Sequence, residues 1–172
     1  SSDQLVWLLK VSEAIALGFK TSKVISSSPE DLNRFLGMRE DPEVKSEFLK
    51  IMEYAKTYQE EKIESVLLEA YKKTNPILFC DEFLSPLLIL VGHSWAKSEI
   101  AIRHEHFISA LVEKFLRSLQ HNFTQEKKPA LKKILLCTIE GEYHYLGLLM
   151  AELTCEYLGV KVVFLGSNTP LA

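Results

Sequence analysis

Residues that could bind a metal stand close together in the segment Glu142-Tyr-His144-Tyr-Leu-Gly147. A neutral imidazole such as that of His144 is a good ligand for a metal such as cobalt. Its second ring nitrogen normally donates to a carboxylate, which fixes the tautomer. Glu142 supplies a carboxylate two residues earlier, and Gly147, one helical step further on, would leave room for a large planar ligand. Taken alone, this pattern also fits an ordinary surface loop, which is the commoner case.

A second group lies earlier in the chain, where Trp95 is followed after nine residues by Glu105 and His106. An indole offers a flat apolar surface, and the other two side chains add directed polar contacts of the kind that ligand sites use. The spacing carries the chain around a helix-to-helix corner, so the three side chains could face one pocket. Taken singly, Trp95 also fits a core or interface position, and Glu105 fits a solvated helix surface.

The run His104-Glu105-His106 resembles a metal cluster in composition only. Consecutive residues on a helix point about 100° apart, so the two histidines do not converge on one ion. The sequence therefore argues against a zinc site at this position.

Composition is that of an ordinary soluble globular protein, with 47% hydrophobic and 25% charged residues among 172. The net charge of -3 argues against nucleic-acid binding by bulk electrostatics. No signal peptide is visible, and the longest apolar run, 83–92, is shorter than the ~20 residues that span a bilayer. We therefore expect a soluble, cytoplasmic protein with no membrane partner. Its three cysteines should be reduced core residues: Cys80, Cys137 and Cys155.

The elements that must position these groups follow from the apolar spacing. Helical periodicity and caps predict helices at 3–17, 28–36, 44–58, 60–73, 75–95 and 102–119. Pro86 should kink the fifth of these. Since the last four are joined by short connections, they predict a four-helix bundle.

After residue 132 the pattern changes to strand, loop, helix and strand, at 133–139, 140–144, 145–158 and 160–165. This spacing predicts a βαβ unit with two parallel, buried strands. His144 then lies beyond the carboxyl end of the first strand, where open parallel sheets bind ligands. Two strands and one helix cannot cover their own faces and edges, so we expect this domain to be incomplete here.

The predicted fold class is therefore α/β plus all-α. It comprises a helical N-terminal segment (1–40), a four-helix bundle (41–125) and an incomplete Rossmann-like domain (131–172).

Both residue groups, in this order and separation, resemble the cobalamin-binding module of the MerR-type light-responsive transcription regulators (the CarH type). In that family a Trp-x9-Glu-His signature in a four-helix bundle covers the upper face of the corrin. A Rossmann-like domain supplies the lower axial histidine from a Glu/Asp-x-His-x-x-Gly loop. Segments 81–106 and 165–170 are also similar to the family. The resemblance covers about residues 43–172, and residues 3–36 resemble the later helices of a MerR DNA-binding domain.

The resemblance implies a sensor and not an enzyme. Cobalamin, as adenosylcobalamin, would have His144 as the ligand of its cobalt, with Glu142 and Gly147 beside it. Trp95, Glu105 and His106 would cover the opposite face. Light would break the cobalt–carbon bond and change how the two domains pack. Oligomeric state would then change, as would DNA binding through a helix-turn-helix domain largely outside this chain.

One departure concerns the light response. Light-sensing members have a second histidine next to the tryptophan, and here that position is Ala96, with His93 as the nearest substitute. Two alternatives to the sensor remain open. One is a corrinoid carrier for methyl transfer, although such carriers lack the Trp-x9-Glu-His pairing. The other is a protein of the same fold that binds another tetrapyrrole or no cofactor.

Overall fold

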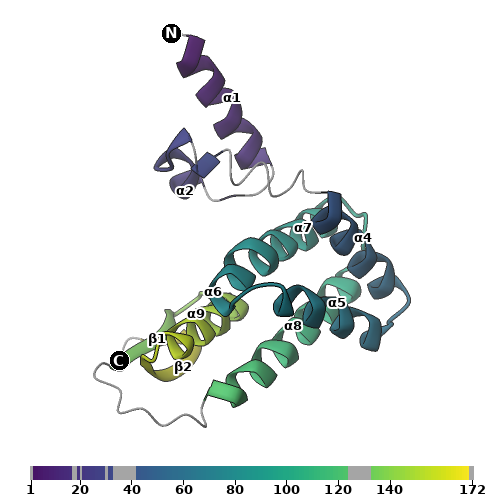
Figure 1. Cartoon of the computed structure of the whole chain (residues 1–172), viewed down its shortest axis with the longest axis vertical. Coiled ribbons are helices and arrows are strands. Elements are labelled where there is room, and N and C mark those ends of the chain that lie inside the picture. The colour runs from purple at the N-terminus through teal and green to yellow at the C-terminus, as the bar shows by residue number, and fades with distance from the viewer. Residues whose placement is uncertain are drawn as a thin grey trace.

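In a computed structural model the chain is described at residues 2–16, 19, 21–29, 31–32, 42–123 and 133–170. Figure 1 shows the elements, which follow in the order α1 (Ser2–Ala16), α2 (Thr21–Ile25), α4 (Pro42–Lys56), α5 (Glu60–Lys72), α6 (Pro76–Leu78), η1 (Phe79–Leu84), α7 (Ser85–Ala96), α8 (Ile102–Phe123), β1 (Lys133–Ile139), α9 (Tyr145–Tyr157) and β2 (Lys161–Thr169). Most of the helix predicted at 28–36 lies outside the described residues, as do residues 37–41 and 124–132.

Residues 42–123 form a helical layer, in which α4, α5, the run α6–η1–α7 and α8 share one hydrophobic core. The apolar faces expected from the sequence point into that core, and its fully buried side chains are Ile51, Ala55, Ile63, Leu67, Phe79, Leu84, Leu87, Ile108, Val112 and Leu116. Full burial of one Leu, Ile or Phe side chain stabilises a fold by about 1.5–3 kcal/mol. The layer therefore has a substantial core of its own.

Helix α6 begins where the sequence predicts it. Asn75 accepts hydrogen bonds at its side-chain oxygen from the backbone nitrogens of Ile77 (3.0 Å) and Leu78 (3.1 Å), and Pro76 occupies the first helical position. Asparagine is among the best N-caps, and proline at this position leaves no additional donor unsatisfied. The helix start at 75–76 is thus confirmed.

A π-helical turn, η1, ends two residues before Pro86, where the sequence predicts a kink. Within this turn the Ser85 backbone nitrogen donates to the carbonyl of Cys80, five residues earlier. Proline cannot donate to the carbonyl four residues back and its ring collides with that carbonyl in a regular α-helix. A wider turn relieves this collision, and the helical run continues to Ala96 without a break.

The run Pro76–Ala96 is, among the described residues, the one helix long and apolar enough by length and composition to cross a membrane. It exceeds the apolar stretch seen in the sequence because the helix continues on both sides of that stretch. Phe79, Leu84 and Leu87 within it are fully buried against the rest of the helical layer. In all, 44% of its apolar window is buried.

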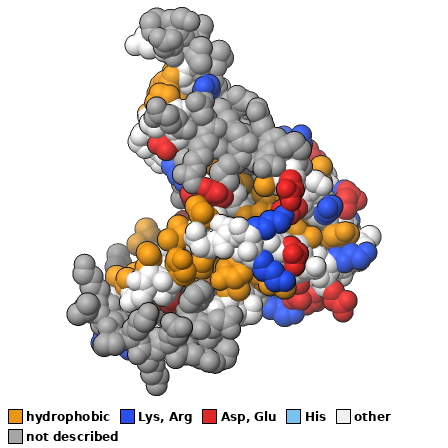
Figure 2. All heavy atoms as spheres, in the orientation of Figure 1, with side chains coloured by type: hydrophobic (Ala, Val, Ile, Leu, Met, Phe, Trp, Pro, Cys, Tyr) orange, Lys and Arg blue, Asp and Glu red, His pale blue; other side chains and the backbone are white. Residues whose placement is uncertain are grey.

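Charged side chains of both signs are interspersed on the helical layer, as Figure 2 shows over α4 and α5. Lys73 bridges Glu43 (2.6 Å) and Glu47 (3.0 Å) of α4, and Lys114 of α8 bridges Glu60 and Glu64 of α5 (both 2.7 Å). Hydrogen bonds to these carboxylates raise the pKa of both lysines. Exposed pairs of this kind each contribute little to stability, so the core dominates.

Strands β1 and β2 form a two-stranded parallel sheet, as predicted. Helix α9 packs on one face of this sheet. Leu149 and Leu153 of α9 are fully buried in the same core cluster as the helical layer. Helix α9 therefore lies between the sheet and the helical layer, and it joins them into one packed unit.

The opposite face of the sheet is exposed, which corrects the expectation that both strands are buried. Its exposed apolar side chains are Leu135, Ile139, Val163 and Leu165. Cys137 lies on the same face and is exposed, so its predicted core position is wrong. Cys80 is buried as expected, and Cys155 is half-buried. An apolar run does not reveal which faces are covered, and in this chain α9 covers only one.

Candidate functional site

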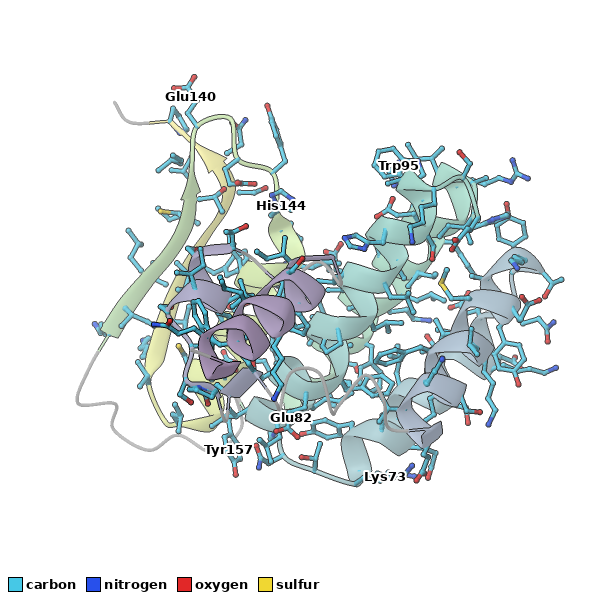
Figure 3. The ribbon with its side chains drawn as sticks, turned by 90° about the horizontal axis from the view of Figure 1, so that it is seen from above. Lys73, Glu82, Trp95, Glu140, His144 and Tyr157 are labelled. Atoms are coloured by element: carbon cyan, nitrogen blue, oxygen red, sulfur yellow. The ribbon has the colours of Figure 1, made fainter. Side chains whose placement is uncertain are left out.

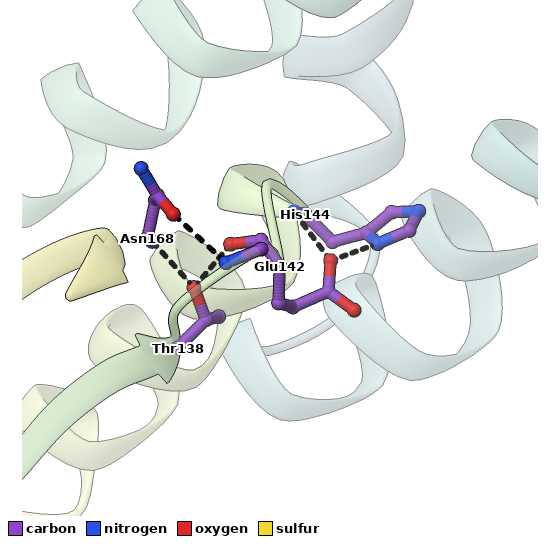
Figure 4. Close-up of polar contacts among 5 residues, drawn as sticks. Thr138, Glu142, His144 and Asn168 are labelled. Carbon is purple, nitrogen blue, oxygen red and sulfur yellow. Dashed lines mark hydrogen bonds and ion pairs between the residues drawn. The ribbon is translucent and has the colours of Figure 1, made fainter. Parts of the chain in front are cut away.

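His144 stands at the N-terminal end of α9, directly after the loop that leaves β1. Its side chain is 92% exposed. One carboxylate oxygen of Glu142 accepts hydrogen bonds from the His144 backbone nitrogen (2.9 Å) and from its ring nitrogen Nδ1, as Figure 4 shows. The carboxylate thus holds both the backbone and the ring of the histidine, and it leaves Nε2 as the nitrogen available to a ligand.

The charge on Glu142 determines which nitrogen of His144 can bind a metal. The pKa of Glu142 is lowered, first by the hydrogen bond from the His144 backbone nitrogen and then by the one from its side chain. An ionised carboxylate only accepts hydrogen bonds, so Nδ1 carries the proton. A neutral His144 is therefore protonated at Nδ1 and presents its lone pair at Nε2. In this tautomer Nε2 can ligate a metal.

Two residues that the sequence analysis did not single out hold this loop to the end of β2. Thr138 Oγ1 donates to the carbonyl of Glu142 (2.5 Å) and accepts from the Asn168 backbone nitrogen (2.9 Å). That nitrogen also donates to the Glu142 carbonyl (3.1 Å), and Asn168 Oδ1 accepts from the Gly141 backbone nitrogen (2.8 Å), as seen in Figure 4. Asn168 has a φ of 55°, and asparagine is one of the few residues that adopt this left-handed conformation.

Trp95 and the pair Glu105-His106 lie on either side of the corner between α7 and α8. Trp95 is in the last turn of α7 and its side chain is exposed. One Glu105 carboxylate oxygen lies 2.6 Å from His106 Nδ1, and the other accepts a hydrogen bond from the Ser109 hydroxyl (2.8 Å). In both groups a carboxylate oxygen therefore lies close to the Nδ1 of a histidine, but among the described residues only Glu142 forms hydrogen bonds to its histidine.

The corner itself is held by backbone bonds around Ser94, which is buried. Its carbonyl accepts from the backbone nitrogens of Glu99 (2.8 Å) and Ile100 (3.4 Å). His104 is also buried, and its Nδ1 accepts from the Ala101 backbone nitrogen (3.4 Å). His104 therefore belongs to the packing of the corner, whereas His106 lies in solvent.

Figure 3 shows Trp95 on α7 and His144 at the start of α9, on separate elements. None of the hydrogen bonds or ion pairs of the described residues joins the upper group (Trp95, Glu105, His106) to the lower group (Glu142, His144). The link between them runs along α8, because Arg117 of α8 donates to the Tyr145 hydroxyl. Twelve helical residues separate Glu105 from Arg117, which corresponds to about 18 Å along the axis.

Gly147, in the first turn of α9, faces open space. A Cβ atom built at this position would meet no atom within 4 Å. Neither packing within the described chain nor a positive φ calls for glycine here, although glycine in a helix destabilises by up to about 1 kcal/mol relative to alanine. An open glycine surface beside an imidazole with a free Nε2 fits a large planar ligand that bears a metal.

Comparisons with known proteins give the following matches. Residues 50–120 match the model of the family described as the B12 binding domain. The chain is 34% identical over 113 residues to the HTH-type transcriptional repressor CarH of Myxococcus xanthus. This alignment covers 66% of this chain and 37% of CarH. It is 29% identical over 164 residues to the HTH-type transcriptional repressor CarA of the same organism. This alignment covers 95% of this chain and 49% of CarA.

The match to the B12 binding domain includes Trp95, Glu105 and His106, whereas Glu142 and His144 lie beyond it. The alignment with CarA covers 95% of this chain, so it extends over both the upper and the lower group. In these alignments the chain spans half or less of the length of the two repressors. Residues 50–120 are thus similar to the B12 binding domain, and the chain is similar to parts of the transcriptional repressors CarH and CarA.

Proposed function

We propose that this chain is the cobalamin-binding sensor module of a transcription regulator. The helical layer would act as a four-helix bundle that caps the cofactor, and β1, α9 and β2 would form part of a Rossmann-like domain beneath it. The observation that carries the proposal is the exposed imidazole of His144, held at Nδ1 by Glu142 at the carboxyl end of β1. Homology to two repressors supports regulation, not catalysis, as the purpose of binding.

Each site residue has a role that its surroundings support. His144 would ligate the cobalt through Nε2, Glu142 would fix the tautomer, and Gly147 would let the ring approach. Trp95 would cover the upper face, with Glu105 and His106 offering polar contacts at its edge. Bound cobalamin would supply a cobalt to which an imidazole can bind and, in the adenosyl form, a light-sensitive cobalt–carbon bond.

The signal would pass through packing. The upper and lower groups sit on different elements, so loss of the upper substituent would change how the helical layer and the sheet pack on the cofactor. We propose that this change alters oligomeric state and DNA binding in the cytoplasm. The DNA-binding helix-turn-helix would lie largely outside this chain, with α1 and α2 near its end. Because Ala96 stands where the resemblance implies a second histidine, the light response is tested separately from cofactor binding.

Absorbance titration tests the proposal directly. Hydroxocobalamin and adenosylcobalamin are each added to the protein, in the dark and after illumination. We expect a shift to a histidine-ligated spectrum, its loss in His144→Ala, and its retention in the neighbouring control Tyr143→Ala, because the Tyr143 side chain is 70% exposed. If neither cofactor changes its spectrum, the proposal is wrong. Methyl transfer from methylcobalamin to a thiol in the dark would instead favour the methyl-carrier function.

A further inference from the structure

Arg117, in the middle of α8, contacts both α9 and β2. Its Nη2 donates to the hydroxyl of Tyr145, and its guanidinium carbon lies 5.5 Å from the ring centroid of Tyr145 and 5.5 Å from that of Phe164. The two rings pack edge to face at 5.7 Å. Tyr145 is the first residue of α9 and Phe164 is in β2. One side chain of the helical layer therefore rests on both elements of the neighbouring unit.

A carboxylate completes this contact. Arg117 Nη1 lies 3.8 Å from a Glu152 oxygen, and the same oxygen accepts from Gln120 Nε2 (2.8 Å), one turn further along α8. The Glu152 side chain is only 12% exposed. A planar guanidinium can stack on rings and pair with a carboxylate at once, which a lysine cannot do. The contact thus has a directional requirement that an ordinary surface ion pair lacks.

The position of this contact matters because Tyr145 directly follows His144. The other partners in the proposed site, Glu105 and His106, begin the same helix that carries Arg117. Arg117 therefore lies where α8 meets the histidine-bearing end of α9. We infer that Arg117 is a positioning residue for the cofactor site, which fixes where His144 stands relative to the upper group. This inference rests on the proposed function.

The first measurement needs no cofactor. Hydrogen exchange is compared between the wild type, Arg117→Met and the control Lys114→Met. Lys114 lies three residues earlier on α8, and its ion pairs within the described part of the chain are with Glu60 and Glu64 of α5, so its loss removes the same charge without touching α9. We expect faster exchange at 145–149 in Arg117→Met and no change there in Lys114→Met. Equal exchange at 145–149 in Arg117→Met and the wild type would overturn the inference.

The second measurement is the dissociation constant for hydroxocobalamin. Removal of a residue that orients a metal ligand typically weakens metal affinity about ten- to a hundred-fold, so we expect a loss of that size in Arg117→Met. Arg117→Lys, which keeps a charge beside Glu152 but lacks the planar group, should weaken binding in the same direction. It decides the question if Arg117→Met does not fold. Lys114→Met should bind as the wild type does.

The outcomes separate the two claims. If the wild type does not bind hydroxocobalamin, the proposed function itself fails. If the wild type binds and both Arg117 variants bind equally tightly, Arg117 is a structural contact only, and the inference is overturned even if exchange at 145–149 has increased.

Discussion

At the scale of single residues, the candidate site contains two histidines, each with a carboxylate oxygen close to its Nδ1. Glu142 reaches His144 across one intervening residue, and Glu105 reaches its immediate neighbour His106. The two pairs differ in their surroundings. The first sits on a loop fastened to β2 by Asn168, whereas the second begins a long helix. Only the first is placed at the carboxyl end of a strand, where parallel sheets bind ligands.

Glu142→Gln tests whether the charge of Glu142 orients the His144 ring and keeps its Nε2 basic. Glutamine still accepts a hydrogen bond but carries no charge, so it fixes the ring less firmly and makes Nε2 less basic. We expect cobalamin affinity to fall by about ten- to a hundred-fold. Absorbance titration measures this, with Glu140→Gln as the matched control because Glu140 is exposed on the same loop. Equal affinities in both variants would contradict the role given to Glu142.

At the scale of elements, α9 contains two residues that its own packing does not explain. Gly147 has open space where a side chain would stand. Glu156 has a buried carboxylate oxygen that finds no hydrogen-bond partner among the described residues, and burial, followed by the charge of Glu152, raises its pKa. Each feature disfavours the folded helix, so replacing either residue should stabilise the protein.

Gly147→Ala should stabilise the cofactor-free protein and weaken binding. Alanine favours a helix over glycine by up to about 1 kcal/mol, and the added methyl group would meet no atom of the described residues within 4 Å. The same methyl group would stand where the proposed macrocycle approaches. Thermal unfolding and cobalamin titration of the one variant measure both effects. A variant that is stabilised and binds normally would show that the open space is not part of the site.

Glu156→Gln should raise the melting temperature at pH 7. Because the pKa of Glu156 is higher in the folded than in the unfolded state, ionisation destabilises the fold as pH rises through the folded pKa. The gain should therefore disappear below about pH 4.5, where the carboxyl group is protonated in both states. Circular dichroism melts across this range test it, with the exposed Glu99→Gln as control. A gain that is the same at every pH would contradict this account.

Two asparagines show what the sequence could and could not predict. Asn75 bonds to residues two and three positions ahead, so the start of α6 could be predicted from adjacent letters. Asn168 bonds within the loop after β1, 27 residues earlier at Gly141, so its role appears only once the strands pair. The same reason explains the sheet, whose parallel pairing was predicted, whereas the exposure of its outer face depends on what covers it. The contacts of Arg117 likewise join helices that no local pattern relates.

At the scale of the whole molecule, the helical layer and the sheet share a core through α9. Leu153 of α9 is fully buried in the cluster that also contains Phe79 and Leu116 of the helical layer. The two units should therefore unfold together, although they were predicted as separate domains.

Leu153→Ala tests this coupling. The cavity it leaves should destabilise the protein by about 2–5 kcal/mol and lower the melting temperature of a single shared transition. Leu158→Ala, at the exposed end of the same helix, should have little effect. Calorimetry measures both. Two separate transitions, of which only one responds to Leu153→Ala, would show that the units are independent.

The placement of α9 has a mechanical consequence. Its 13 residues span about 20 Å, and Figure 3 shows His144 and Tyr157 at opposite ends. Between these ends, Leu149 and Leu153 are fully buried in the core that α9 shares with the helical layer. We expect α9 to tilt as a rigid helix about these buried residues, so that its His144 end and its Tyr157 end move in opposite directions. A displacement that begins at the cofactor would then also move the surface around Tyr157.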